Sequence, residues 1–216
     1  MAVLHYLYDP LCGWCYGAEP LVRAARAVDG LDVCLRAGGL WPVPTSLPDE
    51  MRRYIREADA RVAALSGQPY GAAYLDGLLL DPDLVLHSPP VIAAVLAAEA
   101  LEPGRGFDMV CGIQHAHYEE GRHVVRHDVL CDIAERLGFD RDAFEAAAAR
   151  APVDEHVAET RRLMSAVGAR GFPTFVLDVE GRRFTVPHHR FASSPPAFAA
   201  WLREEIDRLS GLPLRA

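Results

Sequence analysis

The first forty residues constrain the fold of this chain more than any other segment. Residues 3–8, VLHYLY, are rich in β-branched and aromatic side chains and end at Asp9, which predicts a short buried strand and a turn. Apolar and small residues then recur with helical spacing from about Trp14 to Val28. A second strand is expected over residues 31–37. The chain therefore opens with strand, helix and strand, and two cysteines lie at the start of the helix.

The rest of the chain divides into a helical middle and a short strand-containing end. Residues 47–167 carry helical patterns and no convincing strand. Strand signals return at residues 174–178 and 183–186, joined by a turn, and predict a hairpin. Ser194 and Pro195 then mark the start of a last amphipathic helix. The expected order is βαβ, a long helical segment, and ββα, which is typical of the α/β class.

Cys12 and Cys15 form a CxxC pair at the predicted start of the first helix. Free N–H groups and the positive end of the helix dipole favour a thiolate at Cys12, and Cys15 lies one turn further in. A zinc site would need two more ligands, and there is no second CxxC; Cys111 and Cys131 are isolated in the sequence. The alternatives are a zinc site or two inert core cysteines, and the position of the pair favours redox chemistry.

Composition and charge narrow the function further. The net charge of −8 argues against nucleic-acid partners and acidic membrane surfaces. All 22 basic residues are arginine, which excludes a lysine Schiff base and a P-loop lysine. Neither an export signal nor an apolar run of the ~18 residues that span a bilayer is visible. We therefore expect a cytoplasmic protein, and structural disulfides are rare in that compartment.

A second motif, GFPTF at residues 171–175, precedes the predicted hairpin. Proline cannot donate a hydrogen bond to a sheet, so Pro173 at the beginning of a strand needs a reason. A cis peptide bond between Phe172 and Pro173 would leave the neighbouring backbone free to pair with a substrate. The alternative is an ordinary trans proline at the start of an edge strand.

Together the two motifs resemble the thioredoxin superfamily, and the long helical segment resembles its DsbA-like branch. Residues 4–17, LHYLYDPLCGWCYG, and residues 171–175 are similar to the group of predicted protein-disulfide isomerases. The resemblance implies a thioredoxin fold with a large all-helical insertion between an N-terminal βαβ unit and a C-terminal ββα unit. The implied boundaries are residues 1–43 and 168–216 for the two parts of the thioredoxin fold, and 44–167 for the helical insertion.

The resemblance also implies an activity, thiol–disulfide exchange, and its residues. Cys12 would be the exposed nucleophile and Cys15 the resolving thiol, while Phe172 and a cis Pro173 would bind the substrate. Trp14 is counted with them among the substrate-binding residues, and it either forms an apolar wall beside the disulfide or takes part in substrate recognition. The expected partners are protein or peptide thiols and disulfides, with glutathione as a candidate redox partner, and neither a cofactor nor a metal is expected.

Two departures from the family pattern concern the active site. Thioredoxins and DsbA proteins usually carry a buried carboxylate on the first strand, but this chain has Tyr6 there, with His5 beside it. Proton transfer to and from Cys15 must then use water or another group. The dipeptide between the cysteines, Gly13-Trp14, also lacks the histidine that makes DsbA strongly oxidising, so we expect only a moderate preference for the thiolate.

Two other functions fit the same pattern. Kappa-class glutathione transferases and hydroxychromene carboxylate isomerases resemble a thioredoxin fold with a helical insertion, and they use a single Ser or Cys where the CxxC begins. Glutathione conjugation that survives Cys15→Ala would favour this alternative. A binding module or chaperone that senses redox state is the third possibility, and client binding by a variant lacking both cysteines would support it.

The remaining candidate residues are given local roles. Trp41 either lines a substrate groove or covers the core, and His87 precedes a helix in the insertion and could lie near the groove. Six other histidines are interpreted as solvated or locally bonded, because a pair of histidines binds metal poorly without a third ligand. They form three pairs: His115 and His117, His123 and His127, His188 and His189. Cys34, Cys111 and Cys131 are interpreted as core or helix-face residues.

Overall fold

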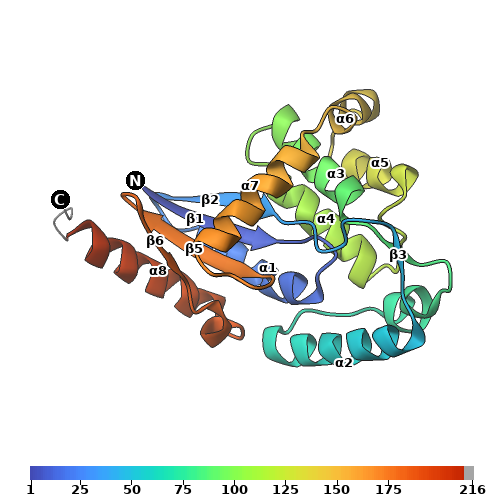
Figure 1. The fold of residues 1–216 in the computed structure, drawn as a ribbon, viewed down its shortest axis with the longest axis horizontal. Helices are drawn as coiled ribbons and strands as arrows, with labels where there is room; N and C mark the ends of the chain where they lie inside the picture. The colour runs from blue at the N-terminus through green and yellow to red at the C-terminus, as the bar shows by residue number, and fades with distance from the viewer. Residues whose placement is uncertain (212–216) are drawn as a thin grey trace.

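A four-stranded mixed sheet lies at the centre of the computed structural model, which describes residues 1–211 (Figure 1). The strand order is β2 (Leu31–Ala37), β1 (Ala2–Tyr8), β5 (Thr174–Val179) and β6 (Arg182–Thr185). Strands β1 and β2 are parallel, whereas β1 with β5 and β5 with β6 are antiparallel. The predicted strands are confirmed, each to within one residue at either end.

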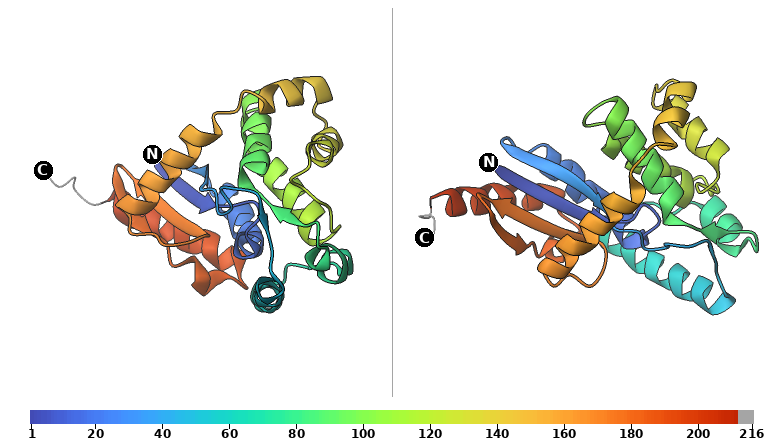
Figure 2. Two further views of the ribbon diagram at one scale, coloured as in Figure 1. Left: turned by 45° about the vertical axis from the view of Figure 1, so that its right-hand side comes forward. Right: turned by 45° about the horizontal axis from the view of Figure 1, so that its top comes forward.

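Helices cover both faces of this sheet (Figure 2). On one face, aromatic side chains of β1 and β5 pack toward α1 (Gly13–Arg26) and α8 (Pro195–Ser210). The side chains of Leu7 and Val176 point to the other face, where they contact Met164 of α7 (Val153–Ala166). Alternation along each strand thus supplies an apolar layer to both sides.

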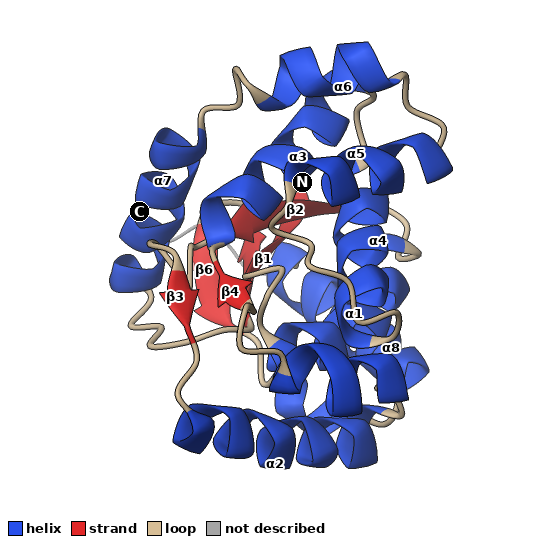
Figure 3. Cartoon of the chain, turned by 90° about the vertical axis from the view of Figure 1, so that its right-hand side faces the viewer, coloured by secondary structure: helices blue, strands red, loops and turns tan. Residues whose placement is uncertain are grey.

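The long segment between β2 and α7 is mainly helical and forms a second lobe beside the sheet (Figure 3). The fold predicted from the sequence, a thioredoxin fold carrying a helical insertion, is confirmed. The elements of this segment that follow β2 are α2 (Asp49–Ser66), a π-helical turn (Ala73–Gly77), a 3-10 turn (Leu78–Leu80), α3 (Ser88–Leu101), α4 (Gly106–Tyr118), α5 (His127–Arg136) and α6 (Arg141–Ala148). One further 3-10 turn, His188–Phe191, precedes α8.

The helical segment also contains a two-stranded ladder that the sequence pattern missed. Strand β3 (Thr45–Ser46) pairs with β4 (Val85–Leu86). Two residues per strand are too few for an alternating pattern to show. The division of the chain at residues 43 and 167 stays a prediction; α7, although it lies within the predicted insertion, packs against the central sheet.

Two glycines of α1 determine how α2 approaches the cysteine pair. A β-carbon added at Gly13 would overlap the Asp59 carboxylate, and one added at Gly17 would overlap the Val62 side chain. The two glycines are four residues apart and therefore lie on one face of α1. Their missing side chains let α2 lie directly on the first turns of α1.

Among residues 1–211, no helix is both long enough and apolar enough to cross a membrane.

Candidate active site

Cys12 and Cys15 lie where β1 meets α1, and both are free thiols. Cys12 is the residue that flanks the helix start, and its carbonyl accepts hydrogen bonds from the N–H groups of Cys15 (2.9 Å) and Tyr16 (3.0 Å). Cys15 is completely buried. Burial raises the pKa of the Cys15 thiol well above its ordinary value, and the adjacent Cys12 adds to the rise.

Cys12 was predicted to be exposed, and this part of the prediction is wrong. Only 7% of the residue is exposed to solvent, because the side chains around it form the walls of a cavity. Its sulfur lies 3.7 Å from the carbonyl oxygen of Phe172, to which the thiol donates a weak hydrogen bond. The small exposed part of Cys12 faces this cavity.

The peptide bond between Phe172 and Pro173 is cis, as predicted. The Phe172 ring packs so closely on Gly38 that a β-carbon there would overlap it. Arg161 of α7 lies over the same ring, with its guanidinium carbon 5.2 Å from the ring centre. Arg161 also donates hydrogen bonds to the carbonyls of Gly38 (2.6 Å) and Gly39 (2.7 Å). One arginine thus links the loop after β2 to the residue before Pro173.

Asp9 joins the same loop to the turn that carries Cys12. Its buried carboxylate accepts hydrogen bonds from the N–H groups of Leu11 (2.9 Å) and Leu40 (2.7 Å). Burial raises the pKa of Asp9, and these two hydrogen bonds oppose the rise. Both carboxylate oxygens accept hydrogen bonds from backbone N–H groups, so Asp9 positions the two loops that carry these groups.

Tyr6 occupies the position on β1 where related folds carry a carboxylate. Its hydroxyl donates a 3.0 Å hydrogen bond to the carbonyl of Cys15, and its ring stacks on Tyr8. Burial raises the pKa of Tyr6 well above its ordinary value. Tyr6 therefore stays un-ionised at neutral pH and does not act as the base for Cys15.

The buried carboxylate of Asp59, on α2, was missed by the sequence analysis. Asp59 is 3% exposed, lies against Gly13, and accepts a 2.8 Å hydrogen bond from the Tyr74 hydroxyl. Burial raises the pKa of Asp59 to about 6, while hydrogen bonds from Tyr74 and Tyr70 favour its ionised form. The Tyr70 hydroxyl is also 3.3 Å from the Gly13 carbonyl. Asp59 is thus ionised at neutral pH beside the start of α1.

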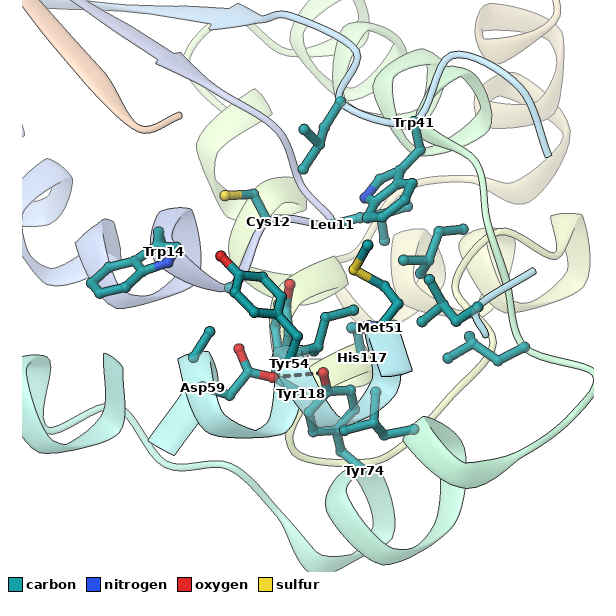
Figure 4. Close-up of a pocket in the computed structure, with 18 of the residues that line it drawn as sticks. Leu11, Cys12, Trp14, Trp41, Met51, Tyr54, Asp59, Tyr74, His117 and Tyr118 are labelled. Carbon is teal, nitrogen blue, oxygen red and sulfur yellow. Dashed lines mark hydrogen bonds between the residues drawn. The ribbon is translucent and has the colours of Figure 1, made fainter. Parts of the chain in front are cut away.

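The Cys12 cavity, with a volume of about 310 Å³, is bounded by α1, α2 and the loops around the cysteine (Figure 4). Figure 4 shows Cys12 at one wall and the hydrogen-bonded pair of Asp59 and Tyr74 at another. Most of the lining is apolar or aromatic, and it includes Trp41, which lines the groove as one of its two predicted roles. No arginine or lysine of residues 1–211 lines this cavity.

A second hollow, the Pro173 cavity, has a volume of about 340 Å³. Trp14 and Phe172 line both cavities, so the two lie on either side of these residues. Trp14 is 42% exposed and offers an open aromatic surface between them. The predicted site residues are therefore brought together: the two cysteines, Trp14, Phe172 and Pro173.

The histidines considered in the sequence are divided between the two cavities and other parts of the molecule. His87 flanks the start of α3 and lines neither cavity. His117 lines the Cys12 cavity, and burial lowers its pKa to about 4, so it is neutral at physiological pH. His188 and His189 line the Pro173 cavity. His123 lies 3.0 Å from Asp81, and His115 lies 2.8 Å from Glu119.

The sequence and structure of this chain are similar to those of known redox proteins. The profile of the DSBA-like thioredoxin domain family matches residues 3–194. Cytosolic disulfide reductase DsbM from Pseudomonas aeruginosa is 45% identical, with a TM-score of 0.88 over 95% of this chain and 99% of that one. The structure of DsbM with GSH gives 44% identity and a TM-score of 0.86 over the same shares of the two chains.

More distant similarities include one to a solved structure and one to a curated protein. A putative protein disulfide isomerase from Nitrosomonas europaea has a TM-score of 0.82 at 23% identity, over 97% of this chain and 99% of that one. The ClpXP adapter protein SpxH of Bacillus subtilis (strain 168) is 23% identical over 144 residues, which are 66% of this chain. That match spans 46% of the length of SpxH.

Proposed function

This chain belongs to the family of DSBA-like thioredoxin domains, and we propose that it is a thiol–disulfide oxidoreductase that reduces disulfides in the cytoplasm. The observation that carries the proposal is the pairing of Cys12, at the wall of an apolar cavity, with the fully buried Cys15 one turn behind it. The name of DsbM, a cytosolic disulfide reductase, supports the direction and the compartment.

The reaction proceeds by two exchanges. The Cys12 thiolate attacks one sulfur of the substrate disulfide, forms a mixed disulfide and releases the other substrate sulfur as a thiolate. The Cys15 thiolate then attacks the Cys12 sulfur, which forms the Cys12–Cys15 disulfide and releases the second substrate thiolate. The substrate gains two electrons, and the pair loses them.

Glutathione is the proposed reductant that regenerates the dithiol. One glutathione thiolate attacks the Cys12 sulfur, breaks the Cys12–Cys15 bond and releases Cys15 as a thiolate, which takes a proton from solvent. A second glutathione thiolate attacks the glutathione sulfur of the mixed disulfide, which forms glutathione disulfide and releases the Cys12 thiolate. The structure of DsbM with GSH supports this partner. A peptide bearing the substrate cysteine would lie across Trp14 and Phe172, where the two cavities adjoin, and pair with the backbone before Pro173.

The negative charge of Asp59 supports the proposal that the cysteine pair reduces disulfides and does not form them. DsbA is a strong oxidant because its reduced form is stabilised. Here an ionised carboxylate lies against the first residue of α1, where it offsets the positive end of the helix dipole. The reduced pair is therefore less stabilised than in DsbA, and it gives up electrons more readily.

Cysteine variants test the proposal, with glutathione-coupled reduction of a disulfide peptide as the assay. Cys12→Ser should abolish reduction, and Cys15→Ser should accumulate mixed disulfides with the peptide and with glutathione, visible by mass spectrometry. Cys34→Ser, a substitution at a half-buried cysteine outside the site, is the matched control and should keep full activity. Full reductase activity in Cys12→Ser would refute the proposal.

The glutathione transferase alternative is less well supported. A transferase of that type needs one nucleophile, whereas this site holds a second thiol directly behind the first. Conjugation of glutathione to an electrophile by Cys15→Ala, at the rate of the unmodified chain, would nevertheless support it.

A further inference from the structure

Helices α5 and α6 bring together three side chains that the redox function does not use. His127 and Cys131 are four residues apart on α5 and share one face of it, and Glu145 faces them from α6. The Cys131 sulfur lies 3.6 Å from Nε2 of His127 and 3.4 Å from Oε1 of Glu145. Nε2 of His127 and Oε1 of Glu145 are 3.3 Å apart. Within residues 1–211, no other three potential metal ligands gather in this way.

These three distances match the separations between ligand atoms in a tetrahedral zinc site. Zinc binds thiolate sulfur at about 2.3 Å and imidazole nitrogen or carboxylate oxygen at about 2.0–2.1 Å. In a tetrahedron, these bond lengths place sulfur about 3.5–3.6 Å from the nitrogen and from the oxygen, and nitrogen about 3.3 Å from oxygen. The observed edges of 3.6, 3.4 and 3.3 Å follow the same pattern.

The donor atoms and their surroundings also fit zinc. A thiolate with an imidazole favours zinc over calcium or magnesium, which prefer oxygen ligands. His127 and Glu145 line a separate cavity of about 330 Å³, bounded by α3, α5 and α6, and both side chains are open to water. This cavity shares no lining residue with the Cys12 cavity.

We propose that His127, Cys131 and Glu145 bind one Zn²⁺ ion, with the fourth position open to water. Binding replaces the proton of the Cys131 thiol with a Zn–S bond and releases that proton to solvent. The ion would connect the first turn of α5 to α6, at the end of the insertion where both helices are short. Figure 1 shows this end of the molecule on the opposite side from α8.

The same contacts have a simpler explanation without a metal. The Cys131 thiol can donate to Glu145, and His127 can form an ion pair with it. The side chains of His127 and Glu145 are 69% and 41% exposed, and an ion pair this exposed contributes little stability. The two explanations differ in one measurable respect, a bond between the Cys131 sulfur and a metal.

Cobalt binding distinguishes them, because Co²⁺ reports thiolate ligation and tetrahedral geometry by its absorption. The full chain should carry Cys12→Ser and Cys15→Ser, so that the CxxC pair cannot bind the ion. We expect one Co²⁺ per chain, a thiolate-to-cobalt charge-transfer band, intense tetrahedral d–d bands, and displacement of the cobalt by Zn²⁺.

Substitutions assign the ligands. In that background Cys131→Ser should remove the charge-transfer band, and His127→Ala and Glu145→Gln should each weaken binding by about tenfold or more. Cys34→Ser and His115→Ala, which change another cysteine and another exposed helical histidine, should leave binding unchanged. A missing charge-transfer band, a band that survives Cys131→Ser, or binding that is insensitive to His127→Ala and Glu145→Gln would overturn the proposal.

Discussion

The Asp59 carboxylate on α2 lies directly against Gly13, the first helical residue after Cys12. This contact exists because Gly13 has no side chain, and Tyr74 and Tyr70 hold the carboxylate in place through hydrogen bonds. A negative charge therefore adjoins the helix end that would otherwise stabilise a thiolate. The contact links the packing of α2 on α1 to the redox behaviour of the cysteine pair.

Removing the charge of Asp59 should make the site more oxidising. Asp59→Asn keeps the size of the side chain but removes the negative charge that opposes the helix dipole at the start of α1. We expect the reduction potential of the pair to rise by about 30 mV, a tenfold shift in its equilibrium with glutathione. An unchanged or lower potential would contradict the assigned role of Asp59.

The same substitution should alter how stability depends on pH. Burial raises the pKa of Asp59 to about 6 in the folded chain, compared with about 3.9 when unfolded. The folded state thus binds more protons than the unfolded state between these values, so the contribution of Asp59 is present below pH 4 and lost by about pH 6. Relative to the native chain, Asp59→Asn should gain about 2–3 kcal/mol of unfolding free energy between pH 4 and pH 7.

Urea unfolding of both proteins across this pH range measures the effect. The comparison has to be a difference between variants, because buried His117 has a pKa lowered to about 4 and acts in the opposite direction. Its stabilisation is lost as the pH falls from about 6.5 toward 4, in both proteins alike. A difference that stays flat or falls with rising pH would show that Asp59 carries no buried charge.

Gly13→Ala tests the close approach of the two helices. Alanine is the better helix former, but its β-carbon would overlap the Asp59 carboxylate, so we expect a loss of about 1–3 kcal/mol. Asp59→Ala in the same chain should recover most of that loss. Gly211→Ala is the control, because Gly211 has a right-handed helical backbone (φ −81°, ψ −5°) and its added carbon would meet other atoms no closer than 3.6 Å. Equal effects at Gly13 and Gly211 in thermal unfolding would argue against the contact.

Tyr6→Phe separates stability from proton transfer. The substitution removes the hydrogen bond to the Cys15 carbonyl, which should lower the unfolding free energy by about 1 kcal/mol. The reduction rate and its pH profile should stay those of the native chain, since Tyr6 does not ionise in the working range. A shifted pH profile with unchanged folding would instead assign Tyr6 a role in proton transfer.

The sequence predicted the sheet and the cysteine pair because both depend on local patterns. The strands at residues 3–8 and 31–37 differ from their observed limits by at most one residue. The cis bond at Pro173 was predicted from the resemblance to the thioredoxin superfamily, because the GFPTF motif alone left cis and trans open. A two-residue ladder such as β3 with β4 carries no comparable pattern. Cys12 was expected to be the exposed sulfur of the pair, whereas here residues of the insertion contribute walls of the cavity that encloses it.

Contacts between distant segments could not be predicted from the sequence. Asp59 is 46 residues after Gly13 and lies in a helix whose other charged residues are mostly exposed. The spacing of Gly13 and Gly17 on one helix face was the available signal for close packing, although it does not identify the partner. Likewise, Cys131 looked isolated because Glu145 comes from the next helix, and only the packing of α5 on α6 brings them together.

The reduction potential of the Cys12–Cys15 pair tests the central proposal most directly. The chain would be equilibrated against mixtures of reduced and oxidised glutathione, and the oxidised fraction would be followed by tryptophan fluorescence, with Trp14 between the two cysteines. A cytoplasmic reductase predicts a value at or below about −220 mV, within or below the range of the cytosolic glutathione pool. A value near about −120 mV, that of DsbA, would contradict reduction as the function. Failure of the two cysteines to form a disulfide in any mixture would contradict the dithiol mechanism itself.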